Sequence, residues 1–343
     1  MRAILCRRLS SRRFSLTEPS HQMSTPESSP IKENAVVKAN GVTRGRFAPS
    51  PTGTLHVGNL RTALVAWLGA VSAGGEMLVR VEDLDRANSS VEKELRQLAD
   101  LERIGLTFPR SVWRQSERFA IYDSIVDDLS SRGLTYRCFC SRKEIRDAVN
   151  APHGRNPDGI YPGTCRDLSD REIADRMAKG RPAAIRLRTE AETYSFDDLV
   201  LGEVEGSVDD FALRRNDGVP AYNLAVVVDD AQQGITQVVR GDDLASSTPR
   251  HLHLQQLLGV TTPRYAHVPL VVGDDGERLA KRHGAVTLDD LAAEGISVEE
   301  VVSVLLESLG LPGSLDDARS VFRWSAITTG AWTIPRRWQT RQP

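Results

Sequence analysis

A His-x-Gly pair beside a Pro-, Ser- and Gly-rich turn offers the chemistry of phosphate binding. The turn, Pro49–Gly53, follows a short run ending in Arg46 and Phe47, and the pair is His56 and Gly58. Apolar residues then recur three and four apart, which predicts a helix. We expect free backbone N–H groups at its start to point at an anion, with His56 as an added donor and Gly58 allowing close approach. The same spacing is equally typical of an ordinary strand-to-helix turn.

Three of the four cysteines cluster in a pattern that suits a metal rather than disulfides. Cys138-x-Cys140 and Tyr161-x-x-x-Cys165 together offer three thiolates and a phenolate, enough for one tetrahedral zinc. Tyrosine is an uncommon fourth ligand, because the ion must lower its pKa from near 10. His153 or water are alternative fourth ligands, and three buried free thiols are the alternative to a metal site.

Two arginines at predicted strand ends, Arg46 and Arg240, suit a substrate that carries two carboxylates. Glu82 would then bind a cationic ammonium, and Tyr222 could hydrogen-bond beside it. Together these side chains describe a pocket for an acidic amino acid. Taken singly, each is more commonly a solvated or ion-paired surface residue.

A basic stretch, RLAKRHG, follows the predicted turn at Asp275-Gly276. It places Lys281 and Arg282 on a loop, where cationic side chains suit the charge that develops on a polyphosphate during nucleotidyl transfer. A solvated basic turn is the alternative interpretation.

The composition describes an ordinary water-soluble globular protein. Of 343 residues, 26% are charged and 40% are hydrophobic, and no apolar run approaches the ~18 to 20 residues of a membrane span. We therefore exclude an integral membrane protein and expect no membrane partner. The formal charge of −2 leaves only local patches for RNA contact. The candidates are two groups of arginines, namely Arg181, Arg186 and Arg188, and Arg336, Arg337 and Arg341.

The elements that must position these residues alternate in type. Met77–Asp85 is typical of a buried strand, and helical spacing marks residues 89–105 and 117–132. This βαβα order predicts a parallel α/β sheet. Leu224–Asp230 and Ile235–Asp243 are also interpreted as buried strands, and open sheets bind ligands where such strands end. In residues 89–105 that spacing is carried by Val91, Leu95, Leu98 and Leu101.

Over roughly residues 44–310 the chain resembles the class I aminoacyl-tRNA synthetases of the glutamyl type. RFAPSPTGTLHVGNLRTAL is similar to the family's H-I-G-H region, and RLAKR, at 278–282, to its K-M-S-K-S loop. VRVEDLDR, WRQSER, YRCFCS and YNLAVVVDD…VVRGDDL resemble further blocks in the family's order. Asn59 stands where the signature ends in His, and Arg278 and Ala280 replace the first Lys and the Ser of the loop. The loss of that hydroxyl puts nucleotide contacts there in doubt, although Lys281 is present.

The resemblance implies an α/β fold, with a Rossmann-like catalytic domain, a zinc-bearing insertion and a short helical C-terminal segment. It implies activation of glutamate with ATP and Mg²⁺, with His56, Gly58 and Lys281 facing ATP and acting in catalysis. It also implies structural zinc on Cys138, Cys140, Tyr161 and Cys165. The glutamate site would comprise Arg46, Phe47, Ala48, Pro49, Ser50, Glu82, Tyr222 and Arg240.

Only 62 residues follow Lys281 (343 − 281), where a full glutamyl-tRNA synthetase has a large anticodon-binding region. Length and cysteine pattern together are similar to those of truncated paralogues that glutamylate the queuosine base in the anticodon loop of tRNA(Asp). We expect that activity in a monomer. A truncated synthetase charging the tRNA 3′ end, and a non-catalytic amino-acid or nucleotide sensor, are the alternatives; Ala280 favours the sensor.

We divide the chain into a disordered leader (1–40), the first half of the catalytic domain (41–135), an inserted zinc-bearing module (136–210), the second half with the mobile lysine loop (211–288), and a short helical C-terminal segment without an anticodon-binding domain (289–343). Residues 1–17 are rich in arginine and contain no acid. We expect a cytoplasmic protein, with an organellar transit peptide or a true start at Met23 left open.

Overall fold

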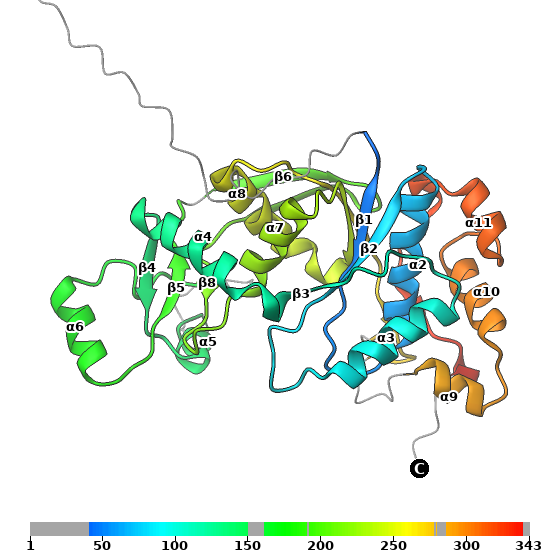
Figure 1. Ribbon diagram of the computed structural model, residues 1–343, viewed down its shortest axis with the longest axis horizontal. Coiled ribbons are helices and arrows are strands. Elements are labelled where there is room, and N and C mark those ends of the chain that lie inside the picture. The colour runs from blue at the N-terminus through cyan, green and yellow to red at the C-terminus, as the bar shows by residue number, and fades with distance from the viewer. Residues whose placement is uncertain (1–40, 150–160, 191, 278, 280–285, 339–343) are drawn as a thin grey trace, which may run out of the picture.

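A computed structural model (Figure 1) describes residues 41–149, 161–190, 192–277, 279 and 286–338. Several predictions lie outside the described residues. They concern the leader at 1–40, His153, Arg278, Ala280, Lys281, Arg282 and Arg341.

A parallel sheet forms the centre of the described chain, as the βαβα pattern predicts. Its five strands have the order β10-β9-β1-β2-β3, and every neighbouring pair is parallel. Because the strands are parallel, their carboxyl ends meet at one edge, where open α/β sheets bind ligands. The strands are β1 (Arg44–Phe47), β2 (Glu76–Val81), β3 (Trp113–Arg114), β9 (Gln237–Gly241) and β10 (Arg264–Val268).

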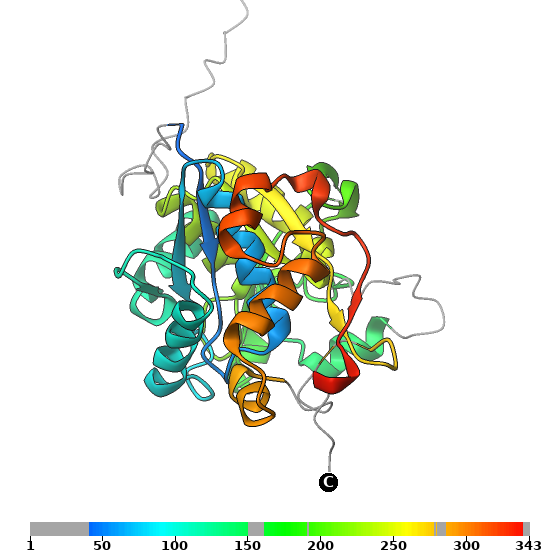
Figure 2. The ribbon, with the colours of Figure 1, turned by 90° about the vertical axis from the view of Figure 1, so that its right-hand side faces the viewer.

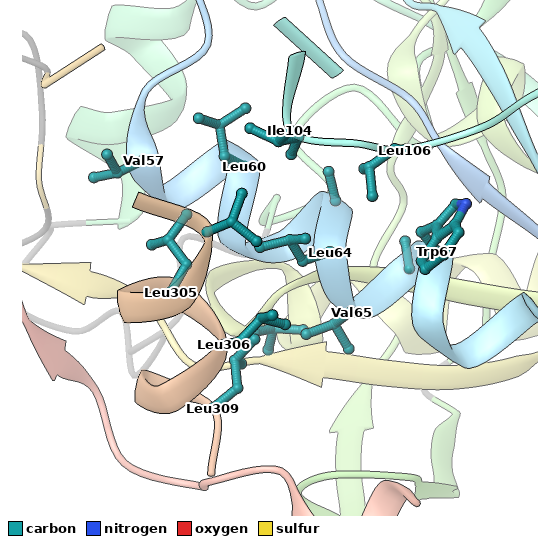
Figure 3. Close-up of a cluster of buried hydrophobic side chains, with 14 of the residues drawn as sticks. Val57, Leu60, Leu64, Val65, Trp67, Ile104, Leu106, Leu305, Leu306 and Leu309 are labelled. Carbon is teal, nitrogen blue, oxygen red and sulfur yellow. The ribbon is translucent and has the colours of Figure 1, made fainter. Parts of the chain in front are cut away.

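Helix α2 (Val57–Val71) crosses this sheet and is buried along most of its length. Leu60, Leu64 and Leu68 are fully buried, as their spacing predicts. Helix α10 (Val298–Ser308) covers the outer side of α2, and Figure 3 shows Leu305, Leu306 and Leu309 against Leu64 and Val65. The apolar stripe that follows the His-x-Gly pair therefore builds the main core. The remaining C-terminal helices are α9 (Leu288–Ala293) and α11 (Leu315–Val321), with α11 also lying against α2 (Figure 2).

Two of the predicted helices are confirmed, but not every apolar residue that marks the spacing of the first is buried. Helices α3 (Val91–Arg103) and α4 (Phe119–Ser131) lie where spacing predicts them. Val91 and Leu95 of α3, however, are 67% and 60% exposed, so only Leu98 and Leu101 pack inward.

The interpretation of Leu224–Asp230 as a strand is wrong. Tyr222–Gln232 forms helix α7, which packs against α8 (Thr248–Leu258) and α4. Residues Leu224 to Gln232 of α7 are all buried, so the helix has no polar face to produce a 3.6-residue period. The other predicted strand, within Ile235–Asp243, is confirmed as β9.

A second, antiparallel sheet carries the cysteine region and lies at the opposite end of the molecule from α10 (Figure 1). It consists of β4 (Thr135–Cys138), β5 (Ala184–Leu187) and β8 (Ala212–Arg214), so it extends past our module boundary at 210. Helices α5 (Arg142–Val149) and α6 (Asp170–Ala178) accompany it. A hairpin of β6 (Thr193–Asp198) and β7 (Gly202–Ser207) returns from this region to contact β10 and α8. No helix in the described ranges is both long and apolar enough to cross a membrane.

Candidate active site

A cavity of about 710 Å³ opens at the carboxyl edge of the parallel sheet. All ten described residues that were predicted to bind glutamate or ATP line it, although they come from four separate parts of the chain. They are Arg46, Phe47, Ala48, Pro49, Ser50, His56, Gly58, Glu82, Tyr222 and Arg240. The sheet and α2 therefore bring the two predicted sites together in one space.

Arg46, near the end of β1, is buried and already has a partner within the protein. Its Nε donates to Asp230 at 3.3 Å, and its Nη1 donates to the carbonyl of Val239 at 3.0 Å. Among the described residues, none accepts a hydrogen bond from its Nη2. Arg46 therefore offers one edge of its guanidinium to the cavity, a more restricted role than the bidentate grip its sequence position suggests.

Arg240, at the end of β9, is a buried cation held entirely by neutral groups. Its Nε donates to His267 at 3.1 Å, and its Nη2 donates to Thr248 at 2.8 Å. Its Nη1 donates to the Tyr222 hydroxyl at 3.3 Å and lies 3.2 Å from Nδ1 of His251. Within the described chain no carboxylate pairs with Arg240, so an anionic ligand in the cavity would supply its counter-charge.

The hydrogen bonds around Arg240 fix both histidines as neutral tautomers. Nε2 of His267 accepts from Arg240, so Nδ1 carries the proton and donates to Asp198 at 2.6 Å. His251 likewise accepts at Nδ1 and donates from Nε2 to Asn223 at 2.9 Å. Burial lowers the pKa of both imidazoles, that of His251 well below 6.5, and the charge of Arg240 lowers them further.

These buried histidines predict a loss of stability in mild acid. As pH falls below 6.5 the unfolded chain binds protons that the folded protein refuses, so stability present above 6.5 is lost. Each histidine should cost up to about 1.4 kcal/mol by about pH 5.5. Urea unfolding of wild type and His251→Gln at about pH 7.5 and 5.5 measures this. The variant should lose about 1 kcal/mol less than wild type over this range, and equal losses would contradict the prediction.

Glu82, the residue directly after β2, lines the cavity and is hydrogen-bonded to the buried Arg80. Nη2 of Arg80 donates to Glu82 at 3.1 Å, and Nη1 donates to Asp230 at 2.6 Å. Burial raises the pKa of the Glu82 carboxyl, while Arg80 and then Arg46 oppose that rise. A substrate ammonium beside Glu82 would further favour the carboxylate.

Sequence reasoning missed Arg80, Asp229 and Asp230, which form a buried charged network behind the cavity. Asp229 also accepts from Arg118 at 2.7 Å and from the Tyr122 hydroxyl at 2.8 Å. A signal was present, because an arginine inside the apolar run MLVRV requires buried carboxylates elsewhere. Two adjacent acids at the end of α7 supply them.

The first amides of α2 already have partners within the protein, so the expectation that they are free to bind an anion is wrong. The N–H of Val57 donates to Val286 at 3.0 Å, and that of Gly58 donates to Nδ1 of His56 at 3.1 Å. His56 is the N-cap of α2, and its own N–H donates to the Asn59 side chain at 3.2 Å. The residue that departs from the family signature therefore helps to cap the helix. A Cβ at Gly58 would lie 3.0 Å from the His56 ring, so glycine leaves room for this cap.

The cysteine cluster has the spacing of a four-ligand metal site. The three sulfurs of Cys138, Cys140 and Cys165 lie within 4.8 Å of one another, and those of Cys140 and Cys165 are 3.5 Å apart. The hydroxyl oxygen of Tyr161 lies 3.3 Å from the sulfur of Cys138 and 3.7 Å from that of Cys140. A tetrahedral zinc with bonds of about 2.3 Å would separate its sulfurs by about 3.8 Å.

The chemistry of these donors also fits a cation. Burial raises the pKa of the Cys140 thiol to about 12, so a thiolate there needs a positive charge close by. The guanidinium of Arg186 lies 3.7 Å from the Tyr161 ring centroid, and Arg176 donates to the sulfur of Cys165 at 3.4 Å. The three cysteine sulfurs could hold a metal ion with the Tyr161 hydroxyl as the fourth ligand.

The predicted RNA-contacting arginines are mostly engaged within the protein. Arg186 is only 9% exposed and donates to the carbonyl of Asp210, so its assignment to an RNA patch is wrong. Arg181 pairs with Glu144 and Arg188 with Asp167. Arg336 and Arg337 form exposed ion pairs with Asp274 and Glu300.

Known proteins resemble this chain over most of its length. The family model "tRNA synthetases class I (E and Q), catalytic domain" matches residues 42–329. A glutamyl-Q tRNA(Asp) synthetase of Nocardia farcinica is 58% identical over 268 residues, covering 78% of this chain and 85% of that protein. One of Cutibacterium acnes is 50% identical, covering 79% of this chain and 77% of that protein.

The fold agrees with a solved structure of the same type. The glutamate tRNA ligase of Elizabethkingia meningosepticum, crystallised with its amino acid, superposes with a TM-score of 0.68 at 27% identity. The match covers 85% of this chain and 67% of that one. With the cavity at the carboxyl edge of a parallel sheet, these likenesses settle the family. The chain belongs to the class I tRNA synthetases of the E and Q type and is a ligase.

Proposed function

We propose that this enzyme activates glutamate with ATP, without tRNA, and then transfers it to the queuosine base in the anticodon loop of tRNA(Asp). The observation that supports the first half is the shared cavity, in which Arg240, without a carboxylate partner in the described chain, lies with Glu82 and the His56 turn. Glutamate supplies the matching groups, two carboxylates and one ammonium.

In the first step an oxygen of the glutamate α-carboxylate attacks the α-phosphorus of ATP, and pyrophosphate leaves. Arg46 and Arg240 hold the carboxylates and Glu82 holds the ammonium, so that positioning does most of the work. We assign His56 and Gly58 to the nucleotide, which binds with Mg²⁺, and also Lys281, which lies outside the described residues. In the second step a hydroxyl of the queuosine cyclopentenediol attacks the adenylate carbonyl, and AMP leaves.

The RNA half of the proposal is supported by relatives. Two glutamyl-Q tRNA(Asp) synthetases, those of Nocardia farcinica and Cutibacterium acnes, are 58% and 50% identical to this chain. Charging of the ordinary tRNA 3′ end remains the alternative.

Two assays separate these functions. Glutamate-dependent exchange of pyrophosphate into ATP, measured without tRNA, should be positive; its absence would instead support a sensor. Glutamylation should then occur on tRNA(Asp) that carries queuosine and not on the same tRNA without it. Glutamylation of queuosine-free tRNA(Glu) would overturn the queuosine assignment in favour of 3′-end charging.

We also propose that Cys138, Cys140, Tyr161 and Cys165 hold a structural zinc. When bound there, the ion would crosslink β4 to the turn before α6. These four residues lie beside the antiparallel sheet and do not line the cavity, so they take no part in the reaction steps.

Removal of one ligand should release this zinc. Cys165→Ser should lose most of the bound metal, because a closed site needs all four donors. Cys6→Ser is the matched control, since it changes the one cysteine outside the cluster. Zinc content by mass spectrometry of the purified proteins tests the prediction, which fails if both variants keep the wild-type amount.

A further inference from the structure

The segment Gly330–Trp338, here called the C-terminal segment, lies beyond the residues that the family model matches. It forms β12 (Trp332–Thr333), which pairs in parallel with β11 (Val271–Val272), as Figure 2 shows for the red end of the chain. The N–H of Trp332 donates to Leu270, and that of Ile334 donates to Val272, both at 3.0 Å. The two hydrogen bonds flank Val271.

The strand that the C-terminal segment holds is a wall of the cavity. Leu270, Val271 and Leu279 all line it, and the N–H of Leu279 donates to Val271 at 3.0 Å. A Cβ placed on Gly58 would lie 3.6 Å from the Cβ of Val271, so this wall stands against the start of α2. It therefore borders the His56 side of the cavity, which the proposed function gives to ATP.

The C-terminal segment is itself firmly attached. Trp338 is 1% exposed and meets Trp332 edge to face, with ring centroids 6.0 Å apart and planes at 86°. Arg336 pairs at 3.1 Å with Asp274, which directly follows Gly273 in the turn between β11 and Leu279. Its neighbour Arg337 pairs at 3.0 Å with Glu300 of α10 instead.

Downstream of β11 and Leu279, residues Val286 and Thr287 contact the start of α2. Thr287 forms an antiparallel bridge with His56, and the carbonyl of Val286 accepts from Val57 at 3.0 Å. In the sequence, Lys281 lies between these two attachments, β11 and Thr287. The attachment at Thr287 is made to His56, a residue of the family's H-I-G-H region. The attachment at β11 is made to the C-terminal segment.

We propose that the C-terminal segment is a positioning element for ATP, which fixes β11 and the cavity wall of Leu270, Val271 and Leu279. The inference rests on the proposed assignment of this side of the cavity to the nucleotide. It predicts a selective effect, because Arg240 is held by His251, His267 and Thr248, none of which belongs to β11 or the C-terminal segment.

Glutamate-dependent pyrophosphate exchange by the full-length protein tests this. Deletion of residues 330–343 should raise the KM for ATP roughly tenfold and leave the KM for glutamate within about twofold. Because that deletion also removes buried apolar side chains, Trp338→Ala and Trp338→Phe form a second pair. Alanine should raise the KM for ATP, whereas phenylalanine keeps the aromatic packing and should restore it to near wild type.

Two exposed variants provide the matched control. Arg336→Ala should raise the KM for ATP by roughly two- to threefold, because it loses the contact with Asp274, whereas Arg337→Ala should not. An unchanged KM for ATP in Trp338→Ala, or equal rises for both substrates, would overturn the inference. Absence of exchange in the wild type would count against the proposed function instead, so the two failures are distinguishable.

Discussion

Arg240→Gln should raise the KM for glutamate in pyrophosphate exchange by roughly 30- to 4,000-fold, because truncating one partner of a buried charge pair costs about 2 to 5 kcal/mol. Arg240 is 5% exposed, and the hydrogen-bond acceptors of its guanidinium are neutral groups. A substrate carboxylate is therefore the group that balances its charge. Glutamine keeps a donor of moderate size but removes the charge and the planar fork.

Arg214→Gln is the matched control for this variant. Arg214 lies on β8 and pairs with Asp123 at 3.3 Å, and it does not line the cavity. Its replacement should leave both KM values within about twofold. If Arg240→Gln retained the wild-type KM for glutamate while folding normally, Arg240 would not contact the substrate.

Arg80→Met should lower the free energy of unfolding by about 3 to 5 kcal/mol, the usual result of removing one partner from a buried ionic network. Arg80 is fully buried between Asp230, at 2.6 Å, and Glu82, at 3.1 Å. Methionine fills a similar volume but leaves both carboxylates with less compensation. The pKa of Glu82, already raised by burial, should rise further and weaken binding of the substrate ammonium.

Arg44→Met tests whether burial is the cause. Arg44 also pairs with a carboxylate, Glu76 at 2.9 Å, but their side chains are 29% and 40% exposed. Its loss should cost less than about 1 kcal/mol in urea unfolding. A similar cost for the two variants would contradict the proposed importance of the buried network.

The sequence predicts the members of the site better than their partners. Arg46, Glu82 and Arg240 follow or end apolar runs, and a parallel sheet brings such positions to one edge. What each arginine binds depends on chain segments far away, since Asp230 lies 184 positions from Arg46. Local spacing carries no information on that pairing, so the ion pair could not be predicted.

Helix α7 shows a second limit. Its apolar, β-branched run is typical of a buried strand, and burial of nearly every residue removes the 3.6-residue periodicity that would identify a helix. The same error explains why the buried network of Arg80, Asp229 and Asp230 was missed. The two aspartates are buried in α7 and do not end a strand. The pairing of the first amides of α2 could not be predicted either, since one of their acceptors, Val286, is distant in sequence.

The hairpin of β6 and β7 has a consequence for building chimeras. Asp198, the last residue of β6, lies within residues 136–210, which the sequence predicts to be an inserted module. It nevertheless accepts a hydrogen bond from His267, which in turn accepts one from Arg240. A recombinant in which residues 136–210 were exchanged as a cassette would therefore also replace part of the support for amino-acid recognition. Any exchange between paralogues that is meant to alter only the RNA preference should place its crossover before β6, so that Asp198 stays with His267.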